Sequence, residues 1–409
     1  MCKRQLKKTE KISFKDMLKY TYKNDLWNYY SDLTTKVNKY LTEDYLSDSK
    51  GFIKAYIGIA NKFVSDVKLT EFIDSLQEWR AQHVVSTFLT GCYLYDKCDL
   101  IQKAIKEKVI EPMKKLSDEE TEPLRYSVKF QFLWFLICLF HDLGYKYEDG
   151  EAETDAPELP KDMIDNMQPP APDFYSMIYK KYMEYRNKEH SKKDHGIYGG
   201  LRLYHDLCTV RKKEVDKLKS DNLLLHNFLN GEKLSAESFI QAMSKEDGKT
   251  YKKKNYLEIR KKRILGWHKM VEHSYNYAAW VILAHNIWYA KESDPNIKSL
   301  YEKYGLEKLI LEEDVYPITL SEYPVLFLFC LVDTIEPIKR IKDIDLLKHI
   351  FLTIDKENKK IIIDIDDNLK CGCCDMVIKQ ASDLNDWLTP TMQRGTNSVE
   401  INLQGNAKE

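Results

Sequence analysis

One stretch of the chain, from Phe130 to Tyr145, constrains the fold more than any other. It reads FQFLWFLICLFHDLGY and is almost entirely apolar until it reaches His141 and Asp142. An apolar run of this length indicates a buried core helix and is too short to cross a membrane. The two polar residues at its end are costly to bury unless a partner satisfies them. A metal ion or a hydrogen-bonded pair in the core would each do so, and this stretch alone favours neither.

Two more strongly apolar segments, within the helices predicted over 267–290 and 323–342, each contain a polar residue that a core would normally exclude. Two further histidines lie beside apolar faces, one of them on a helix predicted over 69–97. In chain order the polar residues are His83, His141, Asp142, His195, His285 and Asp333. One buried histidine is usually a satisfied core residue, but several such placements are difficult to explain in that way. Their wide spacing predicts separate helices that converge on one point, unlike the local ligands of a zinc finger.

These residue types indicate metal chemistry. Imidazole and carboxylate together suit Mn, Fe, Co, Ni or Zn, and Mg is compatible with a carboxylate-rich position. We therefore expect one or two divalent metal ions. An aspartate beside a histidine at a helix end, as in His141-Asp142, can place its carboxylate between two ions. Two ions about 4 Å apart can deprotonate a bridging water and clamp a phosphoryl oxygen, so the pattern is typical of phosphoryl chemistry.

Basic side chains recur near these positions. Three arginines lie three or seven residues from a candidate ligand and therefore share its helix face. Arginine binds phosphate oxygens in a bidentate manner. Glu336, one turn after Asp333, would orient a ligand from the surrounding shell. The expected phosphate-binding residues are Arg80, Lys146, Arg202 and Arg340.

The overall charge excludes a general polyanion binder. The formal net charge of the 409 residues is −1 and 31% are charged, so nucleic-acid binding is not expected. We find no apolar core of a signal peptide and no apolar stretch of about 18 residues, so no membrane segment is expected. The cysteine count is nine, and Cys138 and Cys330 lie in apolar runs, where a free thiol behaves as a small hydrophobe. These features predict a reduced, cytoplasmic protein.

The pattern along the chain predicts a mainly α fold. We expect helices in 1–68 to pack on a helical core over 69–349, which carries insertions at about 147–173 and 211–263. The first insertion is acidic and proline-rich, and it would form either a lid or a surface loop. After about 350 the pattern changes to a small α/β appendage with a disordered tail. That appendage is predicted to contain a hairpin turning near 356–358, then a helix and a last strand, SVEINLQ.

The ordered motifs resemble those of the HD-domain metal-dependent phosphohydrolases. The strongest local match is HDLGY at His141, which is similar to the HDLGH or HDIGH of many members. QHVVSTFLTG around His83, DHGIYGG around His195 and LVDTIEP around Asp333 also resemble the family. The resemblance covers about residues 69–345. It implies an all-helical HD bundle with one or two metal ions that hydrolyses a phosphate ester or anhydride, usually in a nucleotide.

Two branches of the family remain open. Arg80-x-x-His83 resembles the R-x-x-H of the deoxynucleoside triphosphate triphosphohydrolases. Extra ligands at His195 and His285 would resemble the two-metal cyclic nucleotide phosphodiesterases. The triphosphohydrolases commonly follow the last aspartate with lysine, whereas Thr334 stands there in this chain. The absence of a GYP signature disfavours the cyclic di-GMP branch.

The resemblance implies a role for each residue that matches the family motifs. The first ion would be held by His83, His141, Asp142 and Asp333, and the second site would be completed by His195 and His285. Asp142 and His195 would act in catalysis, and His190 is a spare ligand or a general acid.

The expected reaction cleaves a deoxynucleoside triphosphate to nucleoside and triphosphate. The alternatives are a cyclic mono- or oligonucleotide phosphodiesterase and a nucleotide sensor that signals to a partner. Because the triphosphohydrolases are often oligomers gated by nucleotides, the resemblance also implies a homo-oligomer with a nucleotide activator.

Overall fold

The computed structural model describes the helices that carry the candidate ligands and the C-terminal sheet. Lys146 and nearly all of the two predicted insertions lie outside the described residues, as does the predicted tail from residue 405 onward. The described residues are 9–20, 48–60, 73–115, 130–145, 173–190, 194–204, 274–312, 314–341, 343–366 and 372–404.

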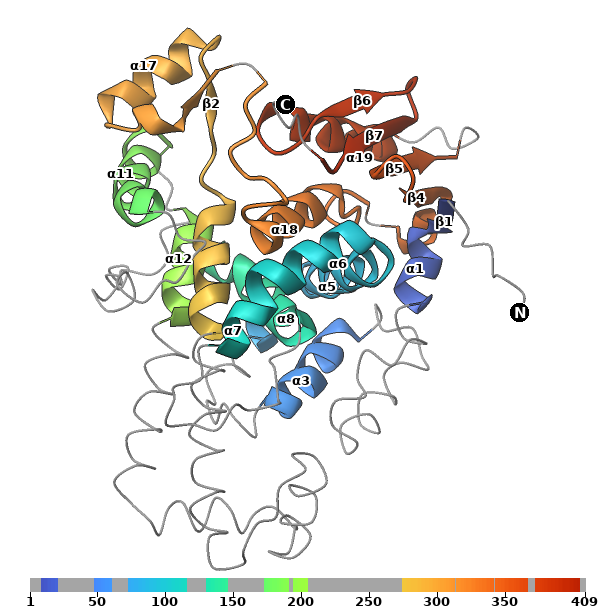
Figure 1. Cartoon of the computed structure of the whole chain (residues 1–409). Helices are drawn as coiled ribbons and strands as arrows, with labels where there is room; N and C mark the ends of the chain where they lie inside the picture. The colour runs from blue at the N-terminus through green and yellow to red at the C-terminus, as the bar shows by residue number, and fades with distance from the viewer. Residues whose placement is uncertain are drawn as a thin grey trace, which may run out of the picture.

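Helices dominate the described chain, which confirms the prediction of a mainly α fold (Figure 1). The first elements are β1 (Thr9–Ser13), α1 (Phe14–Tyr20), α3 (Ser49–Ala60), α5 (Glu78–Lys97), α6 (Asp99–Ile105), η2 (Lys106–Ile110), α7 (Glu111–Lys115), α8 (Phe130–Phe140), η3 (His141–Gly144), α11 (Asp173–His190) and α12 (His195–Leu203). A helix over 274–285 follows. The later elements are β2 (Ala290–Lys291), α17 (Pro295–Lys303), η6 (Glu307–Leu309), β3 (Ile310–Leu311), α18 (Pro324–Ile335), η7 (Ile344–His349), β4 (Ile350–Asp355), β5 (Lys360–Ile365), α19 (Gly372–Asp383), η8 (Leu384–Asp386), β6 (Thr391–Gln393) and β7 (Ser398–Asn402).

The centre of the helical part is the packing of α5 against α8 and α18. The indole Nε1 of Trp134 in α8 donates a 2.9 Å hydrogen bond to the carbonyl oxygen of Phe88 in α5. Gly91 of α5 faces the same indole, and a Cβ at that position would overlap the ring. The absence of a side chain at Gly91 therefore lets the two helices approach closely enough to bring their ends together.

The helix that carries His83 is shorter than predicted. We expected one helix over 69–97, but α5 begins at Glu78 after Gln77, whose backbone is extended. The residues from 73 to 75 form a separate helical turn. This break leaves His83 in the second turn of α5, where the side chain is fully buried.

The helices predicted over 267–290 and 323–342 also end early. The first is helical over 274–285 in its described part and leads into β2. The second, α18, ends at Ile335 because Glu336 has an extended backbone. Proline at the next position, Pro337, disfavours the helical conformation at the residue before it. Asp333 consequently lies in the last turn of α18.

A five-stranded antiparallel sheet has the order β1-β4-β5-β7-β6. The predicted hairpin is confirmed as β4 and β5 with a turn over 356–359, and the predicted helix and last strand are α19 and β7. β1 was not predicted. It pairs with β4, with Ile12 opposite Leu352, so the N-terminal segment lies beside the C-terminal sheet (Figure 1).

One continuous apolar core joins the helices to the sheet. Buried residues from α1, α5, α8 and α18 belong to the same cluster as those of β4, β5, α19 and β7. α19 packs directly on α18, and α1 and α3 both pack on α5. In the described part of the chain, every helix is too short or too polar to span a membrane.

Candidate metal centre

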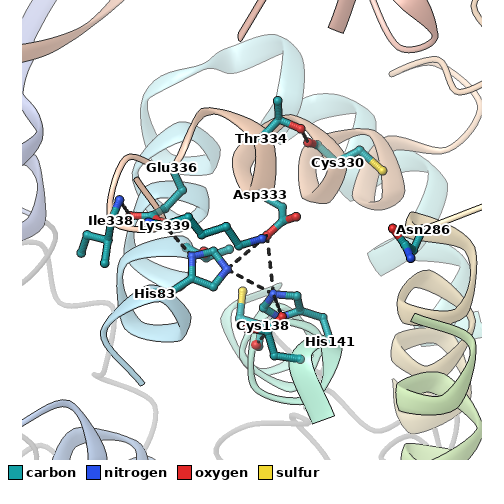
Figure 2. Close-up of polar contacts among 12 residues, drawn as sticks. His83, Cys138, His141, Asn286, Cys330, Asp333, Thr334, Glu336, Ile338 and Lys339 are labelled. Carbon is teal, nitrogen blue, oxygen red and sulfur yellow. Dashed lines mark hydrogen bonds and ion pairs between the residues drawn. The ribbon is translucent and has the colours of Figure 1, made fainter. Parts of the chain in front are cut away.

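Three elements far apart in the sequence bring the first candidate ligands together. α5 supplies His83, the 3-10 turn η3 supplies His141 and Asp142, and the last turn of α18 supplies Asp333. The apolar α8 buries its own C-terminal end, which is why the two polar residues that follow it lie inside the protein. Figure 2 shows His83, His141 and Asp333 pointing toward one another from these separate elements.

The ligand atoms of His83, His141 and Asp142 all lie within 4.8 Å of one another, and all three side chains are buried. The two Nε2 atoms of the histidines are 3.2 Å apart. Asp142 Oδ1 lies 3.0 Å from His141 Nε2. Asp333 Oδ1 lies 3.2 Å from His83 Nε2 and 3.5 Å from His141 Nε2. The four residues predicted as ligands of the first ion therefore converge in the structure.

The neighbours of the two rings fix which nitrogen faces the cluster. His83 Nδ1 donates to the Glu336 carboxylate at 2.7 Å, and His141 Nδ1 donates to the carbonyl oxygen of Cys138 at 2.7 Å. Oxygen acceptors of this kind require the proton on Nδ1, so the neutral form of each ring has its lone pair on Nε2. Glu336 is itself held by the backbone N–H of Ile338 at 2.8 Å. Glu336, which we expected to orient a candidate ligand, therefore contacts the His83 ring.

This arrangement fits a divalent cation. The two Nε2 atoms lie 3.2 Å apart, two carboxylates lie against them, and both nitrogens offer a lone pair once the rings are neutral. Neither carboxylate oxygen of Asp142 accepts a hydrogen bond among the described residues, although both are buried. A buried site with more electron pairs than donors is unfavourable unless a cation occupies it. Imidazole nitrogens with carboxylate oxygens are a donor set that transition metals accept.

The electrostatics of the cluster also favour a cation. Burial disfavours the charged form of His141, but the Asp142 and Asp333 carboxylates outweigh it and raise the pKa of the ring to about 9. The same pairing holds the pKa of Asp142 well below its usual range, although burial acts in the opposite direction. Burial likewise opposes ionisation of Asp333, but Lys339 and the two histidines lower its pKa well below the usual value. The site thus stabilises positive charge at its centre.

Cationic side chains surround the carboxylates. Arg80 Nη1 lies 3.6 Å from Asp142 Oδ2, so Arg80 lies beside the cluster, as we expected from its spacing to His83. Lys339 Nζ lies 2.5 Å from Asp333 Oδ1 (Figure 2). Arg340 is half-buried, and its guanidinium pKa is lowered by burial despite the nearby Asp333 and Glu336 carboxylates. Burial of cations beside anionic groups creates a site that can accept phosphate charge.

Lys339 was missed by sequence reasoning. It lies six residues after Asp333, which is not a helical spacing, and its side chain reaches back because the chain turns after α18 ends. The signal that could have found it is the Glu336-Pro337 pair, which predicts a helix stop followed by a turn.

A second group of residues lies beside the first. The ring centroids of His141 and His285 are 5.8 Å apart, and those of His285 and His195 are 5.5 Å apart. Tyr145 stacks on His195 with centroids 4.0 Å apart, and the Arg80 guanidinium lies 3.9 Å from the Tyr145 ring. All four histidines of the predicted ligand set therefore lie in one connected cluster of rings.

Three further residues were predicted to belong to the site. His190 is exposed at the end of α11, where its Nε2 lies 3.0 Å from the hydroxyl of Tyr185. Arg202 lies in the last turn of α12, two turns from His195. Lys146 belongs to the part of the chain that the structure leaves undescribed. His190 thus contacts Tyr185, and the phosphate-binding role expected of Arg202 stays a prediction.

Comparison with known proteins adds no relative: no protein family, curated protein or solved structure matches this chain.

Proposed function

We propose that this chain is an HD-type metal-dependent phosphohydrolase that acts on nucleotides. The observation that carries the proposal is the convergence of two buried histidine Nε2 atoms with the carboxylates of Asp142 and Asp333. Arg80 and Lys339 adjoin these carboxylates. The order and motifs of these residues resemble the HD-domain hydrolases, as described above.

Each residue of the cluster would have a distinct role in this reaction. His83, His141, Asp142 and Asp333 would hold the ion. A bound divalent ion supplies Lewis acidity to a phosphoryl oxygen and makes water a stronger nucleophile near neutral pH. Arg80 and Lys339 would neutralise charge on the phosphate groups, because both are already held next to the ligand carboxylates.

The first choice of substrate is a deoxynucleoside triphosphate. A triphosphate carries more negative charge than one divalent ion can neutralise. Besides Arg80, two more cationic side chains, those of Lys339 and Arg340, lie near the carboxylates of the proposed ion site. The Arg80-x-x-His83 spacing, which resembles the triphosphohydrolases, puts the arginine at the carboxylate of Asp142.

A cyclic nucleotide phosphodiesterase is the second candidate, and one observation favours it. His285 is buried and adjoins His141, and its Nε2 has no hydrogen-bond partner among the described residues. An unsatisfied imidazole nitrogen beside the first cluster is compatible with a second metal ion.

A product assay tests the proposal. The purified chain would be incubated with Mn²⁺ and each deoxynucleoside triphosphate, singly and mixed, and with a panel of cyclic nucleotides, and the products would be identified by mass spectrometry. Nucleoside plus triphosphate supports the first substrate class, and activity only in the mixture adds an activating nucleotide. Linear products from cyclic nucleotides support the second class. Metal-loaded protein that binds nucleotides without turnover would contradict hydrolysis and favour the sensor.

A further inference from the structure

The tautomer of each site histidine follows from the group that faces its Nδ1 atom. His83 and His141 face the oxygen acceptors described above, and His285 Nδ1 lies 2.5 Å from the carbonyl oxygen of Ile282. Each of these three rings therefore carries a proton on Nδ1 and can offer the lone pair of Nε2 to a metal ion.

His195 is different. Its Nδ1 lies 3.5 Å from the side-chain nitrogen of Asn286, and an amide nitrogen can only donate. The Nδ1 atom of His195 must therefore be the acceptor. In a neutral imidazole the proton is then on Nε2, which leaves no lone pair there for a metal ion.

The argument depends on the orientation of the Asn286 amide, and two neighbours fix it. The indole Nε1 of Trp288 donates to Asn286 Oδ1 at 2.8 Å, and Asn286 Nδ2 donates to Asp194 Oδ2 at 2.7 Å. An indole N–H is only a donor and an ionised carboxylate is only an acceptor. Rotating the amide by 180° would set donor against donor and acceptor against acceptor, so this orientation is determined by the contacts themselves.

The two residues that orient the amide are themselves anchored. The Trp288 backbone N–H donates to the Tyr182 hydroxyl at 3.2 Å, and its carbonyl oxygen accepts from the Tyr301 hydroxyl at 2.9 Å. Asp194 caps α12 by accepting from the backbone N–H of Ile197 at 3.0 Å. The network is therefore continuous with the helix that begins at His195.

We infer that Asn286 is a positioning residue that holds His195 with its proton on Nε2, so that His195 donates a hydrogen bond to a phosphate oxygen of the substrate rather than binding a metal ion. This role differs from that of metal ligand, which the sequence analysis expected for His195. Unlike His83 and His141, which are fully buried, His195 is partly exposed and can meet a substrate. A ring whose Nδ1 accepts a hydrogen bond carries no proton there, so a single proton on Nε2 makes it neutral.

The donor role rests on the proposed function, whereas the tautomer rests on the described contacts alone, and the test separates them. The full chain, labelled with ¹⁵N-histidine and free of metal, would be measured at pH 7.5 by two-bond ¹H–¹⁵N correlation, with His195 assigned through His195→Gln. We expect His195 to show the Nε2–H pattern and His285 the Nδ1–H pattern. An Nδ1–H pattern at His195 would overturn the inference, whatever the protein hydrolyses.

Two variants sharpen the test. Asn286→Ala should abolish the single Nε2–H pattern of His195. The matched control is Asn296→Ala, which replaces an exposed asparagine on α17 and should leave the pattern unchanged.

Zn²⁺ titration gives an independent readout that does not depend on folding of the Asn286 variant. His195→Gln should change the Zn²⁺ dissociation constant by less than about threefold, below the roughly 10–100-fold loss that disturbed metal surroundings cause. A loss as large as that of His141→Gln would make His195 a ligand and refute the inference.

Discussion

At the scale of single residues, Asp142 is the group on which the proposed metal centre depends most directly. Its carboxylate is buried between His141 and Arg80 and accepts no hydrogen bond among the described residues. Asp142→Asn keeps the shape but removes the charge, so we expect metal affinity to fall about 100-fold or more and turnover to be lost. Isothermal titration with Zn²⁺ or Mn²⁺ measures the affinity.

The matched control for this substitution is Asp375→Asn, which makes the same chemical change at an exposed position of α19. Its metal affinity should equal that of the unsubstituted chain. Unchanged affinity in Asp142→Asn would mean that the cluster is a buried hydrogen-bonded group that binds no ion.

The raised pKa of His141 predicts how metal affinity depends on pH. The ring binds a metal only when neutral, and its pKa is about 9 in the folded, metal-free chain against an ordinary value of 6.5. Protonation of this group stabilises the metal-free fold fully below about pH 6.5, and that contribution is lost as the pH rises through about 9. Asp142 and Asp333 stay ionised over this range because their pKa values are lowered.

Metal binding must therefore displace one proton between about pH 6.5 and 9. The apparent metal association constant should rise by about tenfold for each pH unit over that range. Titrations between pH 6.5 and 8.5, in buffers of different ionisation enthalpy, measure both the slope and the proton released. A flat profile would show that His141 holds no proton in the metal-free site.

At the scale of elements, the turn after α8 and the start of α12 are held together by a close backbone contact. A Cβ added at Gly144 would overlap the backbone carbonyl of His195, which cannot move aside as a flexible side chain could. Gly144→Ala should therefore lower the free energy of unfolding by about 2–4 kcal/mol and displace His195 from its stack on Tyr145.

Gly372→Ala is the control for that substitution. A Cβ at Gly372, at the start of α19, would meet no atom within 4 Å, so its effect on stability should be within about 0.5 kcal/mol. Chemical denaturation measures both variants. Equal stabilities would show that η3 and α12 can separate without cost.

The helices and the first ligands could be predicted because both depend on local pattern. A strongly apolar run requires a buried helix, and a polar residue such as Asp333 at its end then requires a partner inside the protein. A local sequence pattern does not predict how the chain turns between helices. Lys339 contacts Asp333 through such a turn, and Asn286 contacts His195 from a different segment, so the sequence separation of either pair does not predict the contact.

At the scale of the whole molecule, β1 was unpredictable for a related reason. The segment TEKIS is too short and too polar for its own pattern to indicate a strand, and its partner β4 lies near the other end of the chain. Because of this pairing, the sheet contains β1 as well as the strands after residue 350, whereas the sequence had indicated a C-terminal appendage. The continuous core then predicts that helices and sheet unfold together.

Disrupting β1 tests that prediction. Consecutive N–H groups of a strand point to opposite sides, so Lys11→Pro with Ile12→Pro removes a ladder hydrogen bond to β4 in either register. The double variant should lose on the order of 2 kcal/mol of unfolding free energy across the molecule, and Lys11→Val with Ile12→Val should not. Metal affinity should stay unchanged, because the ligands lie on helices.

Denaturant unfolding and hydrogen exchange distinguish the outcomes. Faster exchange in 350–355 with an unchanged unfolding midpoint would show that the sheet is an independent unit.

The pairing of β1 with β4 also has a consequence for how the protein is made. A ribosome releases β1 long before Asp333 and β4, because both follow much later in the sequence. Until then the nascent chain exposes an unpaired strand edge and an incomplete set of ligands, both open to wrong partners. Neither the sheet nor the candidate metal centre can be completed before Asp333 and β4 have been synthesised, so metal loading is expected to follow synthesis of the helical part.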